Sequence, residues 1–339
     1  PTSPATPAAT SCSRSTPAVL VRDVDAVNGS TRARSRALVE PVECVVEHLH
    51  ASLVVADDAL RGRFTHGATT LELALPPNWI DDGLAHDDEW RIEWVKLYEG
   101  LNLAAAFAVS NDLRYWEVWS TLVGSFCEQV PVDHDTSDVT ARRLQNWIYA
   151  AQRFEAAGAP IDSSFAGRLR QRLVADLDHL AKHLTPERNH RTLELYALFI
   201  GSLALADRDR AAAALDLLAE NAASDIWPDG AHRECSSDYH HIVTRSFVGA
   251  IANAGRADLD VPEMLTDRTL AALEFGMHLQ APDGTTPALS DGDRVDFGQL
   301  YLAAADLFDR ADFRWVGSRA VAGEVPAQLD VAFGTSGYV

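Results

Sequence analysis

Positively charged residues are scarce in this sequence. It has 29 Lys and Arg against 49 Asp and Glu among 339 residues, which gives a formal net charge of −20. General binding to nucleic acids or to anionic membranes is therefore not expected, because both surfaces are themselves negatively charged. The same charge repels a polyanionic substrate at long range, so such a substrate would require a locally basic cleft.

Long apolar runs, cysteine pairs and common catalytic motifs are also missing. No run of roughly 18 or more apolar residues occurs, so no transmembrane helix is expected. The four cysteines, Cys12, Cys44, Cys127 and Cys235, show neither CxxC spacing nor a disulfide framework, so buried or inert thiols are expected. The lack of GxSxG, Walker, GxGxxG and HExxH patterns disfavours serine hydrolases, NTPases, dinucleotide-binding proteins and zincins. No cofactor is predicted.

Strand patterns are nearly absent before the end of the chain. Residues 1 to about 35 are rich in Pro, Ala, Ser and Thr and have no apolar signal-peptide core, which predicts a disordered leader over residues 1–40. An extended piece is expected over residues 64–75, and a strand after Pro326. Helical spacing of apolar residues predicts a short helix within residues 41–60 and helices over residues 89–109, 112–128, 138–157, 163–184, 190–206, 208–223, 238–254, 262–279 and 295–308.

The short connections between these helices imply that neighbouring helices pack as antiparallel hairpins. The predicted fold class is therefore all-α, an incomplete (α/α) toroid of helix hairpins. A linear solenoid is the competing architecture, but the sequence shows no self-similarity at a fixed period.

Titratable residues are concentrated in Trp227–Arg245, which reads WPDGAHRECSSDYHHIVTR. Residues 228–230 predict a turn, and Ser236, Ser237 and Asp238 are candidate N-caps of the helix that follows. Tyr239 and His240 would then lie in the first helical turn, where free N–H groups and the helix dipole favour a phenolate and disfavour an imidazolium. A capped helix with polar decoration is the simple alternative, but the density of titratable groups favours a functional site.

A second polar cluster, Glu187–Arg191 (ERNHR), opens another predicted helix. Asn189 serves there either as an N-cap or as an amide that, with nearby N–H groups, donates to a substrate carboxylate. The neighbouring His190 and Arg191 add positive charge to a molecule that has little of it.

A third cluster, residues 287–293 (PALSDGD), places Asp291 and Asp293 on either side of a glycine. The full EF-hand spacing is missing, so a loop or N-cap role is expected and no metal site is predicted. Core packing is the first explanation for the many tryptophans, with stacking on sugar rings as the alternative for those near loop–helix junctions.

Four stretches of the chain, in the family's order, resemble the heparinase II/III-like polysaccharide lyases, which also include some alginate lyases. They are residues 76–94 (PPNWIDDGLAHDDEWRIEW), 143–148 (RLQNWI), 188–205 (RNHRTLELYALFIGSLAL), and 227–245 together with 287–293. The resemblance covers roughly residues 50–339. It implies an (α/α) toroid, here residues 41–325, followed by a β-sandwich that would begin in residues 326–339.

The reaction that this resemblance implies is β-elimination at a uronic acid. The substrate carboxylate must be neutralised before C5 can lose its proton, a base removes that proton, and an acid protonates the departing O4. Carried over by motif, Asn189 would neutralise the carboxylate with help from His190, and Tyr239 would act as base, acid or both. Cationic neighbours and the helix start would have to lower the pKa of Tyr239. The residues expected to bind substrate are His240, Glu234, Arg191, Arg245, Trp147, Trp227 and Asp291.

The predicted partner is an acidic polysaccharide or oligosaccharide. The resemblance also implies a further His from the β-sandwich and a periplasmic or secreted location, although no export signal is visible. Two alternatives stay open: a catalytically silent carbohydrate-binding toroid, and an (α/α)-barrel glycoside hydrolase with Glu234 and either Asp291 or Asp293 as paired carboxylates. The change Tyr239→Phe should abolish a lyase and spare such a hydrolase. The sequence does not indicate an oligomeric state.

Overall fold

A computed structural model describes residues 38–45, 51–80, 87–281, 283–290, 292–294 and 296–338. The chain divides into two units, Pro1–Arg36 and Ala37–Val339, and all described residues belong to the second. Most of the leader predicted over residues 1–40 lies outside the described residues, as does Asp291.

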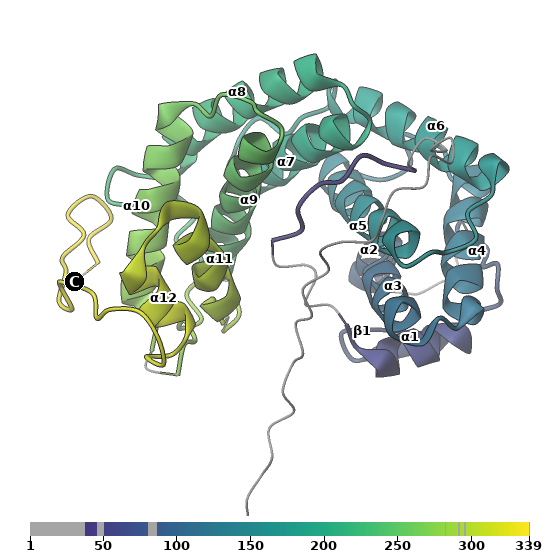
Figure 1. Cartoon of the computed structure of the whole chain (residues 1–339), viewed down its shortest axis with the longest axis horizontal. Coiled ribbons are helices and arrows are strands. Elements are labelled where there is room, and N and C mark those ends of the chain that lie inside the picture. Colours follow the sequence, from purple (N-terminus) through teal and green to yellow (C-terminus); the bar gives the residue numbers. More distant parts are fainter. Residues whose placement is uncertain are drawn as a thin grey trace, which may run out of the picture. The chain divides into compact units, whose positions relative to one another are not determined.

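Helices dominate the described part of the chain (Figure 1), which confirms the predicted all-α class. They are α1 (Leu53–Leu60), α2 (Asp88–Val95), α3 (Glu99–Ser110), α4 (Leu113–Gln129), α5 (Ser137–Ala156), α6 (Ser163–Leu180), α7 (Arg188–Ala204), α8 (Arg208–Asp225), α9 (Ser237–Arg256), α10 (Glu263–Leu279), α11 (Gly298–Phe308) and α12 (Ala311–Gly317). The sheet of the described residues is an antiparallel hairpin of β1 (Arg63–His66) and β2 (Thr69–Glu72), in which Arg63 pairs with Glu72 and His66 with Thr69. Within these ranges, no helix is both long and apolar enough to cross a bilayer.

The helices from α3 onward pack in consecutive pairs: α3 with α4, α5 with α6, α7 with α8, α9 with α10, and α11 with α12. The odd-numbered helices also contact one another in the order α1, α3, α5, α7, α9, α11, while α4 contacts α6 and α8 contacts α10. Hairpins in two layers are the construction of an (α/α) toroid. Because successive helices of a hairpin run in opposite directions, α7 and α9 run the same way and their first turns are neighbours.

Most helices begin and end within a few residues of the predicted bounds, and a local side chain caps several of them, including α4 and α6. The carboxylate of Asp112 accepts from the N–H of Arg114 at 3.0 Å, and that of Asp162 accepts from the N–H groups of Ser164 and Phe165 at 2.8 Å. A negative side chain here both pairs a free N–H group and opposes the helix dipole.

The single helix predicted over residues 89–109 is wrong, because the chain breaks between α2 and α3. Leu97 has a φ of 55° there, in the left-handed region. The break frees the carbonyl of Lys96, which accepts a 2.9 Å hydrogen bond from Nδ2 of Asn146. The neighbouring Gln145 donates to the carbonyl of Leu193 on α7 at 3.2 Å. The RLQNWI motif therefore ties α5 to two neighbouring segments of backbone.

The end of the described chain differs from the prediction in two respects. A short helix, α12, follows α11 and was not expected. In place of the strand predicted after Pro326, the described residues contain only an isolated bridge between Phe333 and Tyr338, whose rings both pack on Phe275 of α10. A strand requires a neighbouring strand for its backbone groups. Among the described residues this segment has one bridge within itself, and the N–H of Ser336 donates to Oδ2 of Asp229 at 2.6 Å.

Tryptophan side chains fill much of the core beside the inner helices. Trp79 stacks on Trp94 with ring centroids 4.2 Å apart, and Trp90 lies 5.5 Å from Trp94. Trp147 is 1% exposed and packs edge-on against Phe126. Core packing, the first explanation from the sequence, is therefore the one that applies to Trp147, and its ring offers no face to a sugar.

Candidate functional site

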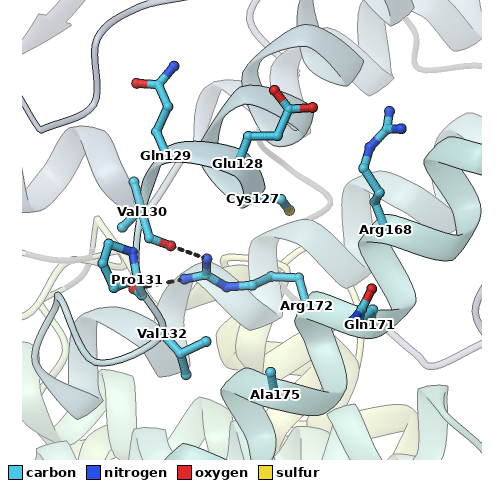
Figure 2. Close-up of a pocket in the computed structure, with 10 residues that line it drawn as sticks. All are labelled: Cys127, Glu128, Gln129, Val130, Pro131, Val132, Arg168, Gln171, Arg172 and Ala175. Carbon is cyan, nitrogen blue, oxygen red and sulfur yellow. Dashed lines mark hydrogen bonds between the residues drawn. The ribbon is translucent and has the colours of Figure 1, made fainter.

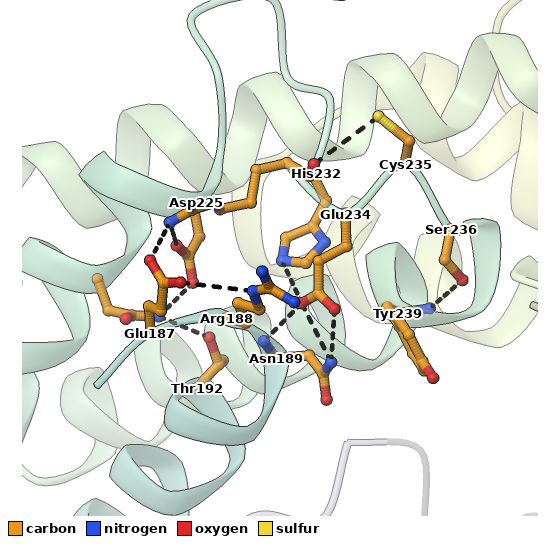
Figure 3. A network of polar contacts seen from close by, with 12 residues as sticks. Glu187, Arg188, Asn189, Thr192, Asp225, His232, Glu234, Cys235, Ser236 and Tyr239 are labelled. Atoms are coloured by element: carbon orange, nitrogen blue, oxygen red, sulfur yellow. Dashed lines mark hydrogen bonds and ion pairs between the residues drawn. The ribbon is translucent and has the colours of Figure 1, made fainter. Parts of the chain in front are cut away.

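The first turn of α7 presents Asn189 to the carboxylate of Glu234 (Figure 3). The backbone N–H of Asn189 donates to Oε1 of Glu234 at 2.9 Å, and its Nδ2 lies 3.1 Å from both Oε1 and Oε2. Since both oxygens are acceptors, the NH₂ side of the amide must face them. The N-cap of α7 is Glu187, so the alternative in which Asn189 caps this helix is wrong.

Glu234 lies in the loop between α8 and α9, which a tight turn folds back on itself. The N–H of Trp227 donates to the carbonyl of Ala231, and the N–H of Gly230 to that of Trp227, both at 2.9 Å. Gly230 has a φ of 92°, and a Cβ at this position would lie 2.0 Å from the carbonyl oxygen of Ala271 on α10. The predicted turn is thus confirmed, and only glycine fits it.

Arg233 fastens this loop to the two helices beside it. Its Nη1 lies 2.9 Å from Oε2 of Glu187 and 3.4 Å from Oδ1 of Asp225, and its backbone N–H donates to the carbonyl of Asp225 at 2.9 Å. The hydrogen bond to Asp225 raises the pKa of Arg233, with the Glu187 carboxylate acting in the same direction. The start of α7, the end of α8 and the loop form one network.

Asp225 was not among the predicted site residues, although the sequence contains a signal for it. It follows Leu215, Leu218 and Ala222 on the buried side of α8, and a carboxylate on an apolar helix face needs a partner. Its side chain is fully buried and accepts from Arg233, and also from Nδ2 of Asn221 at 3.1 Å.

The start of α9 carries Tyr239. Oγ of Ser236 accepts from the N–H of Tyr239 at 3.3 Å, so Ser236 is the N-cap among the three candidates. The third polar cluster, residues 287–293, also contacts the start of α9. The N–H of Leu289 donates to Oγ of Ser237 at 3.3 Å, and a Cβ on Gly292 would lie 2.6 Å from Oγ of Ser236. The structure therefore brings all three polar clusters of the sequence together.

Asn189 and Tyr239 start two parallel, adjacent helices. Figure 3 shows their side chains extending to the same side of the polar network. Tyr239 is half-buried, whereas Asn189 is 6% exposed. Two neighbouring helix starts bring together the positive ends of two helix dipoles, which favours binding of an anion between them.

His240, like Trp147, is a predicted substrate-binding residue whose placement needs correction. It lies in the first turn of α9 as expected, but its ring is buried and its Nε2 lies 2.9 Å from the carbonyl oxygen of Ala272. Burial, with the adjacent His232 acting in the same direction, lowers the pKa of His240 to about 3. The ring is thus neutral at physiological pH, so it supplies no positive charge to Tyr239 and does not reach the surface.

The other predicted residues lie around the same helix starts. His190 is exposed on α7, and Nη1 of Arg191 donates to the carbonyl of Thr185 at 2.9 Å. Arg245 follows Tyr239 by about 240° around α9, so it projects from a different face. Trp227 is half-buried in the turn. In the described part of the chain, no group of three or more His, Cys, Asp or Glu side chains is arranged to hold a metal ion.

A separate cavity of about 520 Å³ lies between α4 and α6 (Figure 2). Arg172 donates there to the carbonyls of Val130 and Pro131, at 2.5 and 3.4 Å, and its Nε donates to Asp176 at 2.8 Å. Burial raises the pKa of Cys127, which lines this cavity, to about 11. Its thiol is therefore protonated at neutral pH and a poor nucleophile.

Comparison with known proteins identifies a family for this chain. The profile of the family described as "Heparinase II/III N-terminus" matches residues 34–315. No protein of curated function matches the chain at a significant level.

Solved structures of lyases share the fold. The crystal structure of heparinase III has a TM-score of 0.72 at 17% identity, over 86% of this chain and 51% of that one. The heparan sulfate lyase HepC from Pedobacter heparinus has a TM-score of 0.65 at 18% identity, over 89% of this chain and 49% of that one. The chain thus spans about half the length of the solved structures it matches. The match over most of its length places the chain in the Heparinase II/III N-terminus family.

Proposed function

We propose that this domain binds a glycan containing uronic acid and contributes Asn189 and Tyr239 to its cleavage by β-elimination. The observation that carries the proposal is the fixed amide of Asn189 beside the half-buried phenol of Tyr239, at two adjacent helix starts.

The C5 proton of a uronate lies next to a carboxylate, and removing it places further negative charge on that group. A single N–H of Asn189 directed between the oxygens of Glu234 accounts for both 3.1 Å distances and leaves the second N–H to a substrate carboxylate. Donors held in place before the reaction stabilise the developing charge without reorganising during it.

Tyr239 is the residue proposed to transfer the proton. Its backbone lies in the first turn of α9, where the helix dipole favours a phenolate. His240 is excluded from this role because it is buried and neutral, and His190 on α7 is the exposed imidazole nearest in sequence to Asn189.

The proposed substrates are acidic glycans, with heparan sulfate first among them because two solved neighbours are named for heparan sulfate or heparin. The strong negative charge of the whole chain requires that the arginines around the site, Arg188, Arg191 and Arg233, attract the glycan locally. Part of their charge is offset, since Arg233 pairs with Glu187 and Asp225.

The test is ultraviolet absorbance of unsaturated uronate on incubation with heparan sulfate, heparin, chondroitin, hyaluronan or alginate. It is run on residues 1–339 and on the complete product of the gene. An absorbance rise that Asn189→Ala and Tyr239→Phe both abolish supports the proposal. Glycan binding with no rise in either form would make the catalytically silent binding domain the correct function. Reducing ends without unsaturation would indicate the hydrolase.

A further inference from the structure

His232 is a buried imidazole without hydrogen bonds. Its side chain is 0% exposed, and among the described residues neither Nδ1 nor Nε2 has a hydrogen-bond partner. Each such unpaired group costs about 1–3 kcal/mol relative to water. Its hydrogen bonds in the described part of the chain are made by the backbone: it forms a bridge with Ile226, and its carbonyl accepts from the N–H of Cys235 at 2.9 Å.

The nearest charged group to this ring is the carboxylate that holds Asn189. Nε2 of His232 lies 3.9 Å from Oε1 of Glu234, which is beyond hydrogen-bonding distance but within the range of an ion pair. Both hydrogen-bonded oxygens of Glu234 face Asn189 on the other side. Glu234 therefore lies between the residue proposed to bind substrate and a histidine that has no partner of its own.

The groups facing His232 come from its own loop and two helices. Burial lowers its pKa, while the carboxylates of Glu234 and Asp225 act in the opposite direction and Arg233 adds to the lowering. From α9, the neighbouring His240 is neutral at physiological pH, because its own pKa is about 3. The net direction is downward, so His232 is neutral in the protein without substrate.

A substrate carboxylate bound at Asn189 changes this balance. It would be a second negative charge close to Glu234, and two like charges about 5 Å apart repel by about 3 kcal/mol at the effective dielectric of a protein surface. A proton on His232 would offset that repulsion and turn the 3.9 Å approach of Nε2 to Oε1 of Glu234 into an ion pair. The unpaired ring therefore lies where one added proton would reduce the repulsion between Glu234 and the substrate carboxylate.

We propose that His232 is a positioning residue that takes up one proton from solvent when a uronate carboxylate binds at Asn189, and then pairs with Glu234. This inference rests on the proposed function, because it requires the uronate to bind at Asn189. His232 does not touch the substrate; it acts through Glu234 on the orientation and charge of the site. Glu234 is 16% exposed, which gives the proton a route from water.

The test is isothermal titration calorimetry of residues 1–339 with a glucuronate tetrasaccharide from desulfated heparan sulfate, in buffers of different ionisation enthalpy. The expected result is uptake approaching one proton per bound tetrasaccharide between the lowered pKa of the free ring and the raised pKa of the bound ring, a window that lies around neutral pH, with affinity falling by up to about tenfold per pH unit across it. The variants His232→Gln and His232→Phe should bind with no proton uptake and with nearly pH-independent affinity. His183→Gln, which changes an exposed histidine after α6, should keep the uptake of the unmodified protein.

Glu234→Gln separates the charge from the ring. It removes the negative charge that His232 is proposed to pair with, so proton uptake should vanish although the imidazole is present. If a His232 variant fails to fold, NMR titration of the His232 ring in the unmodified protein takes the place of that variant. The pKa of the His232 ring should then rise when the tetrasaccharide binds.

The two proposals fail in different ways. Binding of the tetrasaccharide without proton uptake, or uptake that persists in His232→Phe, would overturn the role of His232 and leave the proposed function intact. No binding of any uronate glycan, or unchanged binding by Asn189→Ala, would instead overturn the proposed function.

Discussion

Asn189 donates both its backbone N–H and its side-chain amide to one carboxylate, that of Glu234, 45 residues later in the chain. This pair joins the start of α7 to the loop that leads into α9, and so sets the position of Asn189 relative to Tyr239. A carboxylate as acceptor makes these bonds charge-assisted, which is stronger than an amide–carbonyl pair.

Replacing Glu234 with Ala should therefore release the Asn189 amide. The free energy of unfolding should fall by about 1.5–3 kcal/mol, the range for hydrogen bonds to a charged group, and elimination activity should fall at least tenfold. Glu234→Gln keeps one acceptor oxygen, so its stability and its activity should lie between those of the unmodified protein and those of Glu234→Ala. Chemical denaturation and initial rates measure these effects. Full activity in Glu234→Ala would mean that Asn189 needs no such support.

Replacing Tyr239 with Phe removes only the phenolic oxygen. Activity should fall by about 10²–10⁴, the usual contribution of a proton-transferring side chain, while the protein stays folded at the assay temperature. Tyr115→Phe is the matched control, because its hydroxyl donates to Asp57 at 2.7 Å on α1, far along the chain from the site. Equal losses of activity in the two variants would argue that Tyr239 has a structural role.

Gly230 tests whether the turn before Glu234 positions the site. A methyl group there would lie 2.0 Å from the carbonyl oxygen of Ala271, so Gly230→Ala should lower the free energy of unfolding by more than about 3 kcal/mol. Gly158→Ala is the control, since Gly158 has a similar φ of 83° but no neighbour within 4 Å, and should cost about 1 kcal/mol. Denaturant titration of both variants compares them, and equal losses would show that strain in φ alone accounts for the effect.

His240 should make the protein sensitive to acid. Its pKa is about 3 in the folded chain and 6.5 when exposed, so the unfolded chain binds the proton first as the pH falls. Its contribution to stability is complete above about pH 6.5 and is lost progressively toward pH 3, by about 2 kcal/mol at pH 5. His240→Leu should flatten the pH dependence of unfolding over that window, although it loses the hydrogen bond to Ala272. As a control at an exposed site, His183→Leu should leave the pH dependence of the free energy of unfolding unchanged.

Amphipathic periodicity predicted most of the helices because it is a local property of the sequence. The break at Leu97 could not be predicted in this way, since the carbonyl that it frees is satisfied by Asn146, about 50 residues later. The strand predicted after Pro326 is wrong for a related reason, since strand formation depends on a partner outside the segment.

The site was predictable in composition but not in its contacts. The caps and turns around Ser236 and Gly230 follow from local chemistry, and the structure forms both. The burial of His240 and Trp147 depends on α10 and on Phe126, so the sequence pattern did not distinguish them from exposed residues. The pairing of Asn189 with Glu234 likewise requires the fold that brings α7 and α9 together.

The most direct test of the central claim is exchange of the C5 hydrogen of a glucuronate glycan in deuterated water, followed by NMR. Proton removal requires only a neutralised carboxylate and a base, so it reports on Asn189 and Tyr239 even where cleavage is slow. The proposed function predicts loss of the C5 signal or its conversion to the unsaturated product, and retention of the signal with Tyr239→Phe. A retained C5 signal in a glycan that the unmodified protein binds or hydrolyses would contradict it.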